Sequence, residues 1–151
     1  MIARGFTLVE LVVALGVATL MLATVPASLS RAHEAMEYRT TVREILASLK
    51  SARLAAMQSG TPAAFVLDTG ERRFGADDAP TRGIPERLKV AMILADTELD
   101  ADTSGRIRFY PDGSATGGAI DIVRPSGSGV RLTVDWLLGR VGQTPIEAAL
   151  R

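Results

Sequence analysis

The sequence predicts an α+β fold in which one long N-terminal helix packs on a C-terminal antiparallel β domain. Three observations lead to this prediction. No charged side chain occurs from Leu11 to Leu29, and an amphipathic helical pattern follows as far as Ser59. From Pro62 onward the apolar period changes from three or four residues to two, the period of a β-strand. The 151 residues, 47% of them hydrophobic, suffice for one domain with a modest core.

The uncharged stretch has the length of a membrane span. As a helix, Leu11 to Leu29 would rise roughly 28 Å at ~1.5 Å per residue, close to the ~30 Å hydrocarbon core of a bilayer. Pro26 lacks a backbone N–H, so we expect a bend near the membrane surface. Residues 6–30 are therefore expected to form the transmembrane half of the helix.

Residues 31–59 are expected to form the amphipathic half of the same helix. Their apolar side chains recur at offsets of three and four, which predicts one buried face. The sequence Ser59-Gly60-Thr61-Pro62 supplies the stop signal. The expected buried stripe consists of Met36, Val42, Ile45, Leu46, Leu49, Ala52 and Ala56.

Residues 60–151 are expected to form the β domain. The expected strands are 63–67, 90–94, 106–109, 120–122 and 130–136. The first two are continuous apolar runs, which predicts burial on both faces. The last alternates, which places Val130, Leu132, Val134 and Trp136 on one face. Hairpin turns are expected at 68–70, 111–113, 125–127 and 138–140, and residues 75–86 are expected to form a surface loop.

A carboxylate at the start of the apolar helix needs a partner. At the bilayer centre an acid costs about 2.5 to 3.5 kcal/mol on insertion scales. A cut between Gly5 and Phe6 would create an α-amino group with a pKa of about 7.7 to 8.0, one helical turn from Glu10. An ion pair with its own amine or with that of a neighbouring subunit would neutralise both charges. Removing one partner of a buried pair costs about 3 to 5 kcal/mol.

The segment Arg4-Gly5-Phe6-Thr7-Leu8-Val9-Glu10-Leu11 resembles the processing motif of type IV pilins and type II secretion pseudopilins. The resemblance implies that prepilin peptidase removes a leader of residues 1–5 by cutting between Gly5 and Phe6, and methylates the amine of Phe6. It also implies that Glu10 pairs with a neighbouring subunit's amine during assembly, and that the fold is pilin-like.

The same resemblance implies the partners and the location of the chain. The partners would be other major and minor pseudopilins, prepilin peptidase and, before assembly, inner-membrane lipid. The chain would cross the inner membrane once, with its C-terminal domain in the periplasm. The basic residues beside the span do not place the N-terminus inside, because Arg4 precedes it while Arg31, Arg39 and Arg43 follow. The orientation therefore rests on the resemblance.

Two other interpretations of the start stay open. The small residues of Val25-Pro26-Ala27, before Ser28, suit cleavage of a secretory signal. An uncleaved signal anchor is the second alternative. Against signal cleavage, Glu10 would interrupt the apolar region and the helical pattern would continue past the cut.

Two strings in the β domain carry a narrower resemblance. The first string is residues 109–118, and the second begins at Trp136 and continues to Val141. A hairpin loop would explain the Pro, Asp and Gly of the first string, but it would not explain why the second string occurs as well. Together the strings resemble the signature of the GspH/FimT group of H-type minor pseudopilins and related minor pilins. The signature residues are Phe109, Pro111, Asp112, Gly113, Gly117, Gly118, Trp136 and Gly139. This implies a minor pseudopilin that joins the tip and shaft of the type II secretion pseudopilus and supports protein export across the outer membrane.

The alternative within the same architecture is a FimT-like minor pilin of a type IV pilus, acting in pilus assembly or DNA uptake. Seventeen basic residues balance seventeen acidic ones, and the tail carries only Arg140 and Arg151 against Glu147. A balanced charge gives no general attraction for a polyanion. Nucleic acid is therefore not an expected partner.

No enzyme, cofactor or metal site is expected. The chain has no cysteine, and its one histidine, His33, has Glu34 and Glu37 nearby on a surface helix without a pocket. Residues 100–105, with Asp100 and Asp102, match the first half of a calcium loop, but the twelfth position is Pro111 where a bidentate Glu is required. A membrane-anchored periplasmic enzyme is left as the last alternative.

Overall fold

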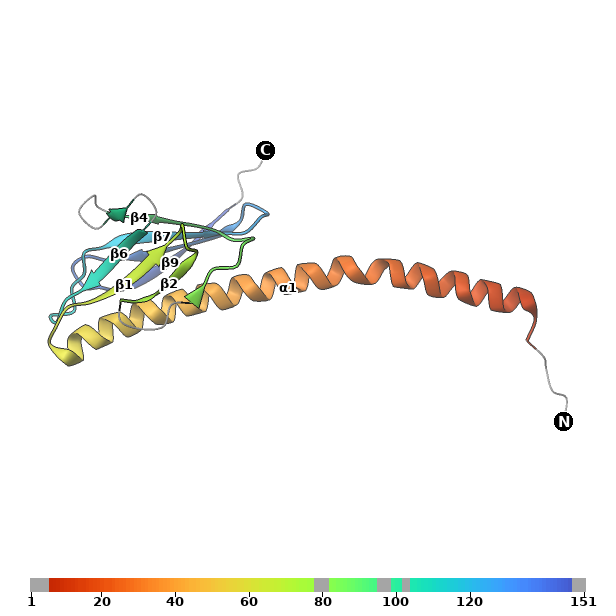
Figure 1. Cartoon of the computed structure of the whole chain (residues 1–151), viewed down its shortest axis with the longest axis horizontal. Helices are drawn as coiled ribbons and strands as arrows, with labels where there is room; N and C mark the ends of the chain where they lie inside the picture. The colour runs from red at the N-terminus through yellow and green to blue at the C-terminus, as the bar shows by residue number, and fades with distance from the viewer. Residues whose placement is uncertain (1–5, 78–81, 95–98, 102–103, 148–151) are drawn as a thin grey trace. The chain divides into compact units, whose positions relative to one another are not determined.

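The computed structural model describes residues 6–77, 82–94, 99–101 and 104–147, and the side chains among them except those of 22–32 and 99–101. The chain forms two compact units, Met1–Met36 and Glu37–Arg151. Its elements are α1 (Leu8–Ser59), β1 (Ala63–Asp68), β2 (Arg73–Ala76), β3 (Arg82–Gly83), β4 (Lys89–Ile93), β5 (Leu99–Ala101), β6 (Ser104–Phe109), β7 (Gly118–Val123), β8 (Gly129–Val134) and β9 (Val141–Ile146) (Figure 1).

The long N-terminal helix is confirmed as one element of 52 residues. Thr7 caps its start, because the N–H of Glu10 donates to the Thr7 hydroxyl at 3.3 Å. It ends as expected at Gly60, which has a positive φ of 69° and donates its N–H to Ala56 O at 3.1 Å. The helical assignment is continuous through Pro26, whose side chain lies outside the described set.

Within the described residues, no helical stretch combines the length and the apolar character needed to cross a membrane. The expected span from Leu11 to Leu29 runs into residues 22–32, whose side chains are not described.

The second half of α1 is amphipathic, with a buried stripe that matches the expected one at four of its seven positions, while Val42 and Leu46 are half-buried. Ile45, Leu49, Ala52 and Ala56 are buried as expected. The prediction for Met36 was wrong, because its side chain is 69% exposed. Nine residues separate it from Ile45, which at ~100° per residue places the two on opposite faces. The stripe continues through Thr41, which is buried and donates its hydroxyl to Glu37 O at 2.9 Å.

The β domain contains two antiparallel sheets with the strand orders β3-β2-β1-β6-β5 and β4-β7-β8-β9. All five expected strands are present, while β2, β3, β5 and β9 were not expected. The prediction of a loop over 75–86 was wrong in part, because β2 extends into it as far as Ala76, β3 lies inside it and Ile84 is buried. These two strands are short and rich in Arg and Gly, so they form because they pair with a neighbouring strand and not because of their intrinsic β-propensity.

The second sheet has two edge strands, β4 and β9, whose sequences reflect that position. The expected burial of 90–94 on both faces was wrong, because in β4 half-buried Val90 and Met92 alternate with exposed neighbours. At the other edge, β9 contains Pro145. Asp135 N donates to Arg140 O at 2.9 Å, so the alternation of the ladder turns residue 145 away from β8. The missing N–H of Pro145 therefore faces outward, where it costs no ladder bond.

One hydrophobic core joins the C-terminal half of α1 to both sheets (Figure 1). The core takes Phe65, Leu67, Phe74, Ile107 and Phe109 from the first sheet, and Ile120, Ile122, Leu132 and Val134 from the second. At the turn between β7 and β8, the guanidinium of Arg124 lies 4.8 Å from the ring centroid of Tyr38 on α1. The antiparallel β domain on a helix is thus confirmed.

Candidate functional site

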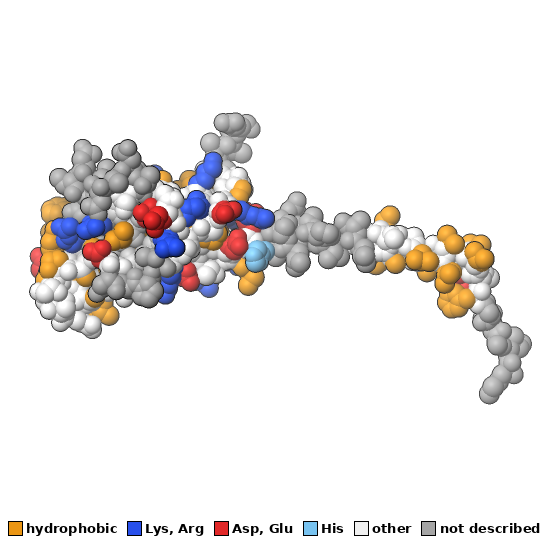
Figure 2. Space-filling view, viewed as in Figure 1, with side chains coloured by type: hydrophobic (Ala, Val, Ile, Leu, Met, Phe, Trp, Pro, Cys, Tyr) orange, Lys and Arg blue, Asp and Glu red, His pale blue; other side chains and the backbone are white. Residues whose placement is uncertain are grey.

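The N-terminal motif is a solvent-facing, almost wholly apolar helix. Phe6 is 79% exposed and Leu8 is 80% exposed, and every described side chain as far as Met21 is exposed. Figure 2 shows the hydrophobic side chains around this part of α1. A helix that is apolar all round is stable only when lipid or other helices cover it. Gly5, the residue before the expected cut, lies outside the described residues.

Glu10 is the one acid in this part of the helix. Its side chain is exposed and makes no ion pair with any residue that the structure describes. The first turn of a helix suits a carboxylate, because the N-terminal N–H groups carry partial positive charge. That position leaves the carboxylate free for a cation from outside the chain.

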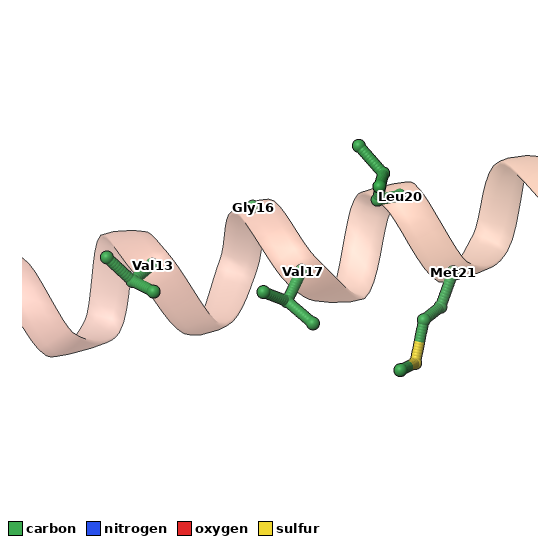
Figure 3. Close-up of a pocket in the computed structure, with 5 residues that line it drawn as sticks. All are labelled: Val13, Gly16, Val17, Leu20 and Met21. Atoms are coloured by element: carbon green, nitrogen blue, oxygen red, sulfur yellow. The ribbon is translucent and has the colours of Figure 1, made fainter.

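A shallow apolar notch follows Glu10 along the helix. Figure 3 shows Gly16 between Val13, Val17, Leu20 and Met21, which line it. Apart from its chain neighbours and the nearby backbone of the helix itself, no described atom lies within 4 Å of the point where a Cβ on Gly16 would stand. The notch is open and apolar, so a packed aliphatic side chain or an acyl chain fits it. It contains no group capable of chemistry.

The signature segment 109–118 contains the expected turn at 111–113, closed by an antiparallel bridge between Phe109 and Ala115, but it does not join two neighbouring strands of one sheet as a hairpin would. Its flanking strands lie in different sheets, β6 in the first and β7 in the second, so the segment is a crossover between them. A tight turn lies inside it, where Gly113 N donates to Tyr110 O at 2.9 Å and Tyr110 N to Ser114 O at 3.0 Å. Gly113 has a positive φ of 87°, which explains the glycine.

Asp112 closes the turn with its side chain. Its Oδ1 accepts the Ser114 hydroxyl at 2.6 Å and the Ser114 N–H at 2.9 Å. These hydrogen bonds, the one from the hydroxyl first, hold the pKa of Asp112 below its ordinary value. Pro111 and Asp112 are both exposed, so their role is to shape the turn.

The crossover is joined to the turn between β8 and β9. Ala115 N donates to Trp136 O at 2.9 Å. A Cβ on Gly117 would lie 3.2 Å from Trp136 Cβ, and one on Gly139 would overlap Gly113 O. The two strings that the signature combined, 27 positions apart from Phe109 to Trp136, therefore form one cluster. We call residues 109–118 and 135–140 the signature cluster.

The other two signature residues serve packing inside the domain. Phe109 is fully buried at the end of β6. Gly118 has a φ of 143°, and a Cβ there would lie 2.5 Å from Leu94 Cδ2. Both positions therefore hold the two sheets together where the crossover enters β7.

Trp136 does not lie on the buried face of β8, so that prediction was wrong. Its side chain is 66% exposed, whereas Leu132 and Val134 are buried as expected. The strand ends at Val134 because Asp135 turns the chain, and its Oδ1 accepts the N–H of Leu138 at 2.7 Å. Strand alternation predicts which way a side chain faces only as far as the last paired residue, which in β8 is Val134.

Arg53 was not among the predicted site residues, although it holds the cluster to the helix. Its Nε donates to Gly113 O at 3.3 Å. A Cβ on Gly139 would lie 3.0 Å from that Nε, and a Cβ on Gly113 would lie 3.2 Å from its NH2 group. The two glycines thus leave space for one guanidinium. An arginine next to buried Ala52 was the only sequence signal for this contact.

The described residues contain no group of three or more His, Cys, Asp or Glu side chains able to hold a metal. His33 is exposed on α1. Of the possible calcium ligands, Asp100 has its backbone in β5 but its side chain lies outside the described set, and Asp102 lies outside it altogether.

Comparisons with known proteins agree with both motifs. The sequence model of the family described as type II transport protein GspH matches residues 41–138, which include all of residues 109–118 and the turn as far as Leu138. The model of the prokaryotic N-terminal methylation motif matches residues 1–26. The two family models thus match different parts of the chain.

One curated relative is the type II secretion system protein H of Xanthomonas campestris pv. campestris. It is 29% identical over 144 residues, which cover 95% of this chain and 85% of the relative. Two solved structures share the fold. The minor pseudopilin EpsH from the type 2 secretion system of Vibrio cholerae gives a TM-score of 0.56 at 15% identity, covering 72% of this chain and 96% of EpsH. The type IV minor pilin FimU of Pseudomonas aeruginosa gives 0.54 at 17%, covering 74% and 91%.

Proposed function

Because the chain belongs to the GspH family of type II transport proteins, we propose that it is a minor pseudopilin, a structural subunit of the type II secretion pseudopilus. The observation that supports this most directly is the combination of two motifs on one chain. An exposed apolar helix with a free Glu10 precedes a β domain that carries the GspH signature cluster. The apolar helix suits packing against other helices in an assembly, and the β domain with its signature cluster suits a specific position of the subunit within that assembly.

We further propose the steps by which the chain enters the assembly. Prepilin peptidase cuts between Gly5 and Phe6 and methylates the Phe6 amine. The chain is anchored in the inner membrane by its apolar helix, with the β domain in the periplasm. During assembly, the amine of a neighbouring pseudopilin pairs with Glu10, which neutralises two charges inside an apolar helical bundle. Within the pseudopilus, the subunit joins the tip to the shaft.

The role is structural rather than catalytic. The GspH family is a family of transport proteins, and the signature cluster uses Asp112 and Asp135 to close turns. Among the described residues, Asp112 accepts hydrogen bonds only from Ser114 and Asp135 only from backbone N–H groups, so neither carboxylate belongs to the set of nucleophile, base and orienting group that a catalytic site requires.

The decisive measurement is intact mass and N-terminal sequencing of the chain extracted from membranes. The expected first residue is N-methylated Phe6. A mature start at Met1 would indicate an uncleaved anchor, and a start at Ser28 would indicate a secretory signal. Either of those results would contradict the proposal.

The type IV minor pilin is the second candidate, because the FimU fold is about as similar as the EpsH fold. A deletion strain separates them, since loss of export across the outer membrane with intact pili supports the pseudopilin. Loss of pili with normal export supports the pilin. For DNA uptake, a gel shift at low and physiological salt is the test, because phosphate contacts give a steep salt dependence.

A further inference from the structure

Five large apolar side chains are exposed at one end of the β domain. Two come from the last turns of α1 and three from the turn between β8 and β9. We call Leu54, Met57, Trp136, Leu137 and Leu138 the end patch, and their exposed fractions run from 47% to 66%. They are connected through the signature cluster, because Gly113 lies against Met57 and Arg53, and Gly139 lies against the same arginine. Exposed apolar groups gathered in this way are typical of an interaction surface.

The end patch is held rigidly. Asp135 Oδ1 accepts the N–H groups of Leu137 at 3.1 Å and Leu138 at 2.7 Å, and Gly139 N donates to Asp135 O at 2.9 Å. The carbonyl of Trp136 is held by Ala115 N. A preorganised loop loses little conformational entropy on binding. Trp is also the residue type most enriched among the side chains that dominate protein interfaces.

The charges around the end patch favour an acidic partner. Asp112 and Asp135 face this end of the domain and carry two formal negative charges, although their carboxylates also accept hydrogen bonds from the chain's own groups. Arg53, whose guanidinium donates to Gly113 O, adds a positive charge beside them. Lys50, one helical turn before Leu54, and Arg140, next to Gly139, are exposed and form no ion pair with the residues that the structure describes. Three cations, Lys50, Arg53 and Arg140, thus stand against two carboxylates, so the end patch has an apolar centre and one positive charge in excess at its edge.

Resting on the proposed function, we propose that the end patch docks a different subunit of the same assembly, through an apolar surface of that subunit edged with carboxylates. A second copy of this chain is disfavoured, because a two-fold contact through the end patch would bring the excess positive charge of both copies together. Lipid is disfavoured as well. One excess positive charge contributes only about 1 kcal/mol toward an anionic membrane surface, and the net charge of the chain is zero.

The absence of native cysteine makes a direct test possible. Leu137→Cys places a thiol in the end patch, and Thr144→Cys places one on exposed β9 as a matched control. Both full-length variants are made in cells with and without the other pseudopilins, and the rate of maleimide labelling is measured in isolated membranes. We expect labelling at position 137 to fall by about tenfold when the other pseudopilins are present, equivalent to ~1.4 kcal/mol of protection. The rate at position 144 is expected to stay unchanged.

Charge reversal tests the second half of the proposal. In the Leu137→Cys background, Lys50→Glu together with Arg140→Glu is expected to restore fast labelling, while circular dichroism shows an unchanged fold. Equal labelling with and without the other pseudopilins, or equal protection at both positions, would overturn the assignment of the surface. Protection in their absence would also overturn it, indicating a second copy if it grows with expression level and lipid if protein-free vesicles reproduce it.

Failure here is distinguishable from failure of the proposed function. A mature start at Phe6 and normal export, combined with an unprotected position 137, would remove the end patch as a docking site and leave the function standing. A start at Met1 or Ser28 would instead remove the function.

Discussion

The two motifs of this chain differ in where their partners lie. In the signature cluster, the turns are closed by contacts inside the chain. The Asp135 carboxylate accepts backbone N–H groups, and the Arg53 guanidinium lies against Gly113 and Gly139. In the N-terminal helix, by contrast, the described side chains from Phe6 to Met21 are all exposed, and Glu10 makes no ion pair with the residues that the structure describes. The first motif builds a surface, whereas the second is, in the proposal above, completed by another molecule. Changes in the two regions should therefore have separable effects.

Glu10→Ala should produce the largest effect, and it should appear only in the assembly. A neighbour's amine left without its carboxylate in an apolar bundle costs about 3 kcal/mol or more, equivalent to ~100-fold lower incorporation. Cleavage and the melting temperature of the β domain should be unchanged. The measurement is the amount of the variant in sheared pseudopili, with exposed Glu71→Ala as control. Normal incorporation of Glu10→Ala would contradict the neutralisation argument.

Gly139→Ala should have the opposite pattern, damaging the β domain and sparing the cleavage site. Its φ is 56°, and the added Cβ would collide with Gly113 O. We expect a loss of at least about 2 kcal/mol in unfolding free energy, measured by urea denaturation of the full chain in detergent. Gly142→Ala is the matched control, because its Cβ would meet only Thr133 O, at 3.9 Å. Equal stability of the two variants would show that the cluster is not rigid.

Arg53→Met sharpens the comparison by removing the link between helix and cluster while keeping an apolar stem. The carbonyl of Gly113 loses a charged donor, and we expect a loss of about 1 to 2 kcal/mol in unfolding free energy. Arg39→Met, on the exposed face of α1, should change it by less than about 0.5 kcal/mol. Indistinguishable denaturation curves for these two variants would mean that the 3.3 Å hydrogen bond contributes nothing.

Asp112→Asn should have the smallest effect, visible only in its pH dependence. The pKa of Asp112 is lowered in the folded chain, so ionisation favours the folded state. That contribution is present above the unfolded pKa, near 3.8, and is lost as the pH falls through the lower folded value. The difference in melting temperature between wild type and variant should therefore be constant near neutral pH and shrink below about pH 3.8. A difference that does not depend on pH would exclude the charge as its cause.

Local patterns were sufficient for much of the fold. The helix, its stop at Gly60 and its buried stripe from Ile45 to Ala56 follow from a period that the sequence displays directly. The five expected strands are present for the same reason. The turn glycines Gly113 and Gly139 were identified as well, since both have positive φ.

The errors in the β domain have one physical origin, which is that pairing between distant segments is not visible in local periodicity. Strands β2, β3 and β9 are made by their neighbours, and β4 is half exposed because it lies at an edge. Met36 was assigned to the buried stripe by its apolar character, although its angle on the helix places it opposite. Nothing near Trp136 in the sequence indicates that the strand ends two residues earlier.

By itself, the sequence determined the long helix, the pilin-like start with Gly5, Phe6 and Glu10, and the family signature, because each depends on residues adjacent along the chain. Only the tertiary structure decided that residues 109–118 cross between sheets, that Arg53 lies under Gly113 and Gly139, and that Trp136 faces solvent. Those facts depend on which strands pair and on the space left between elements. Helical periodicity is a local property, whereas sheet topology is set by the burial of one shared core.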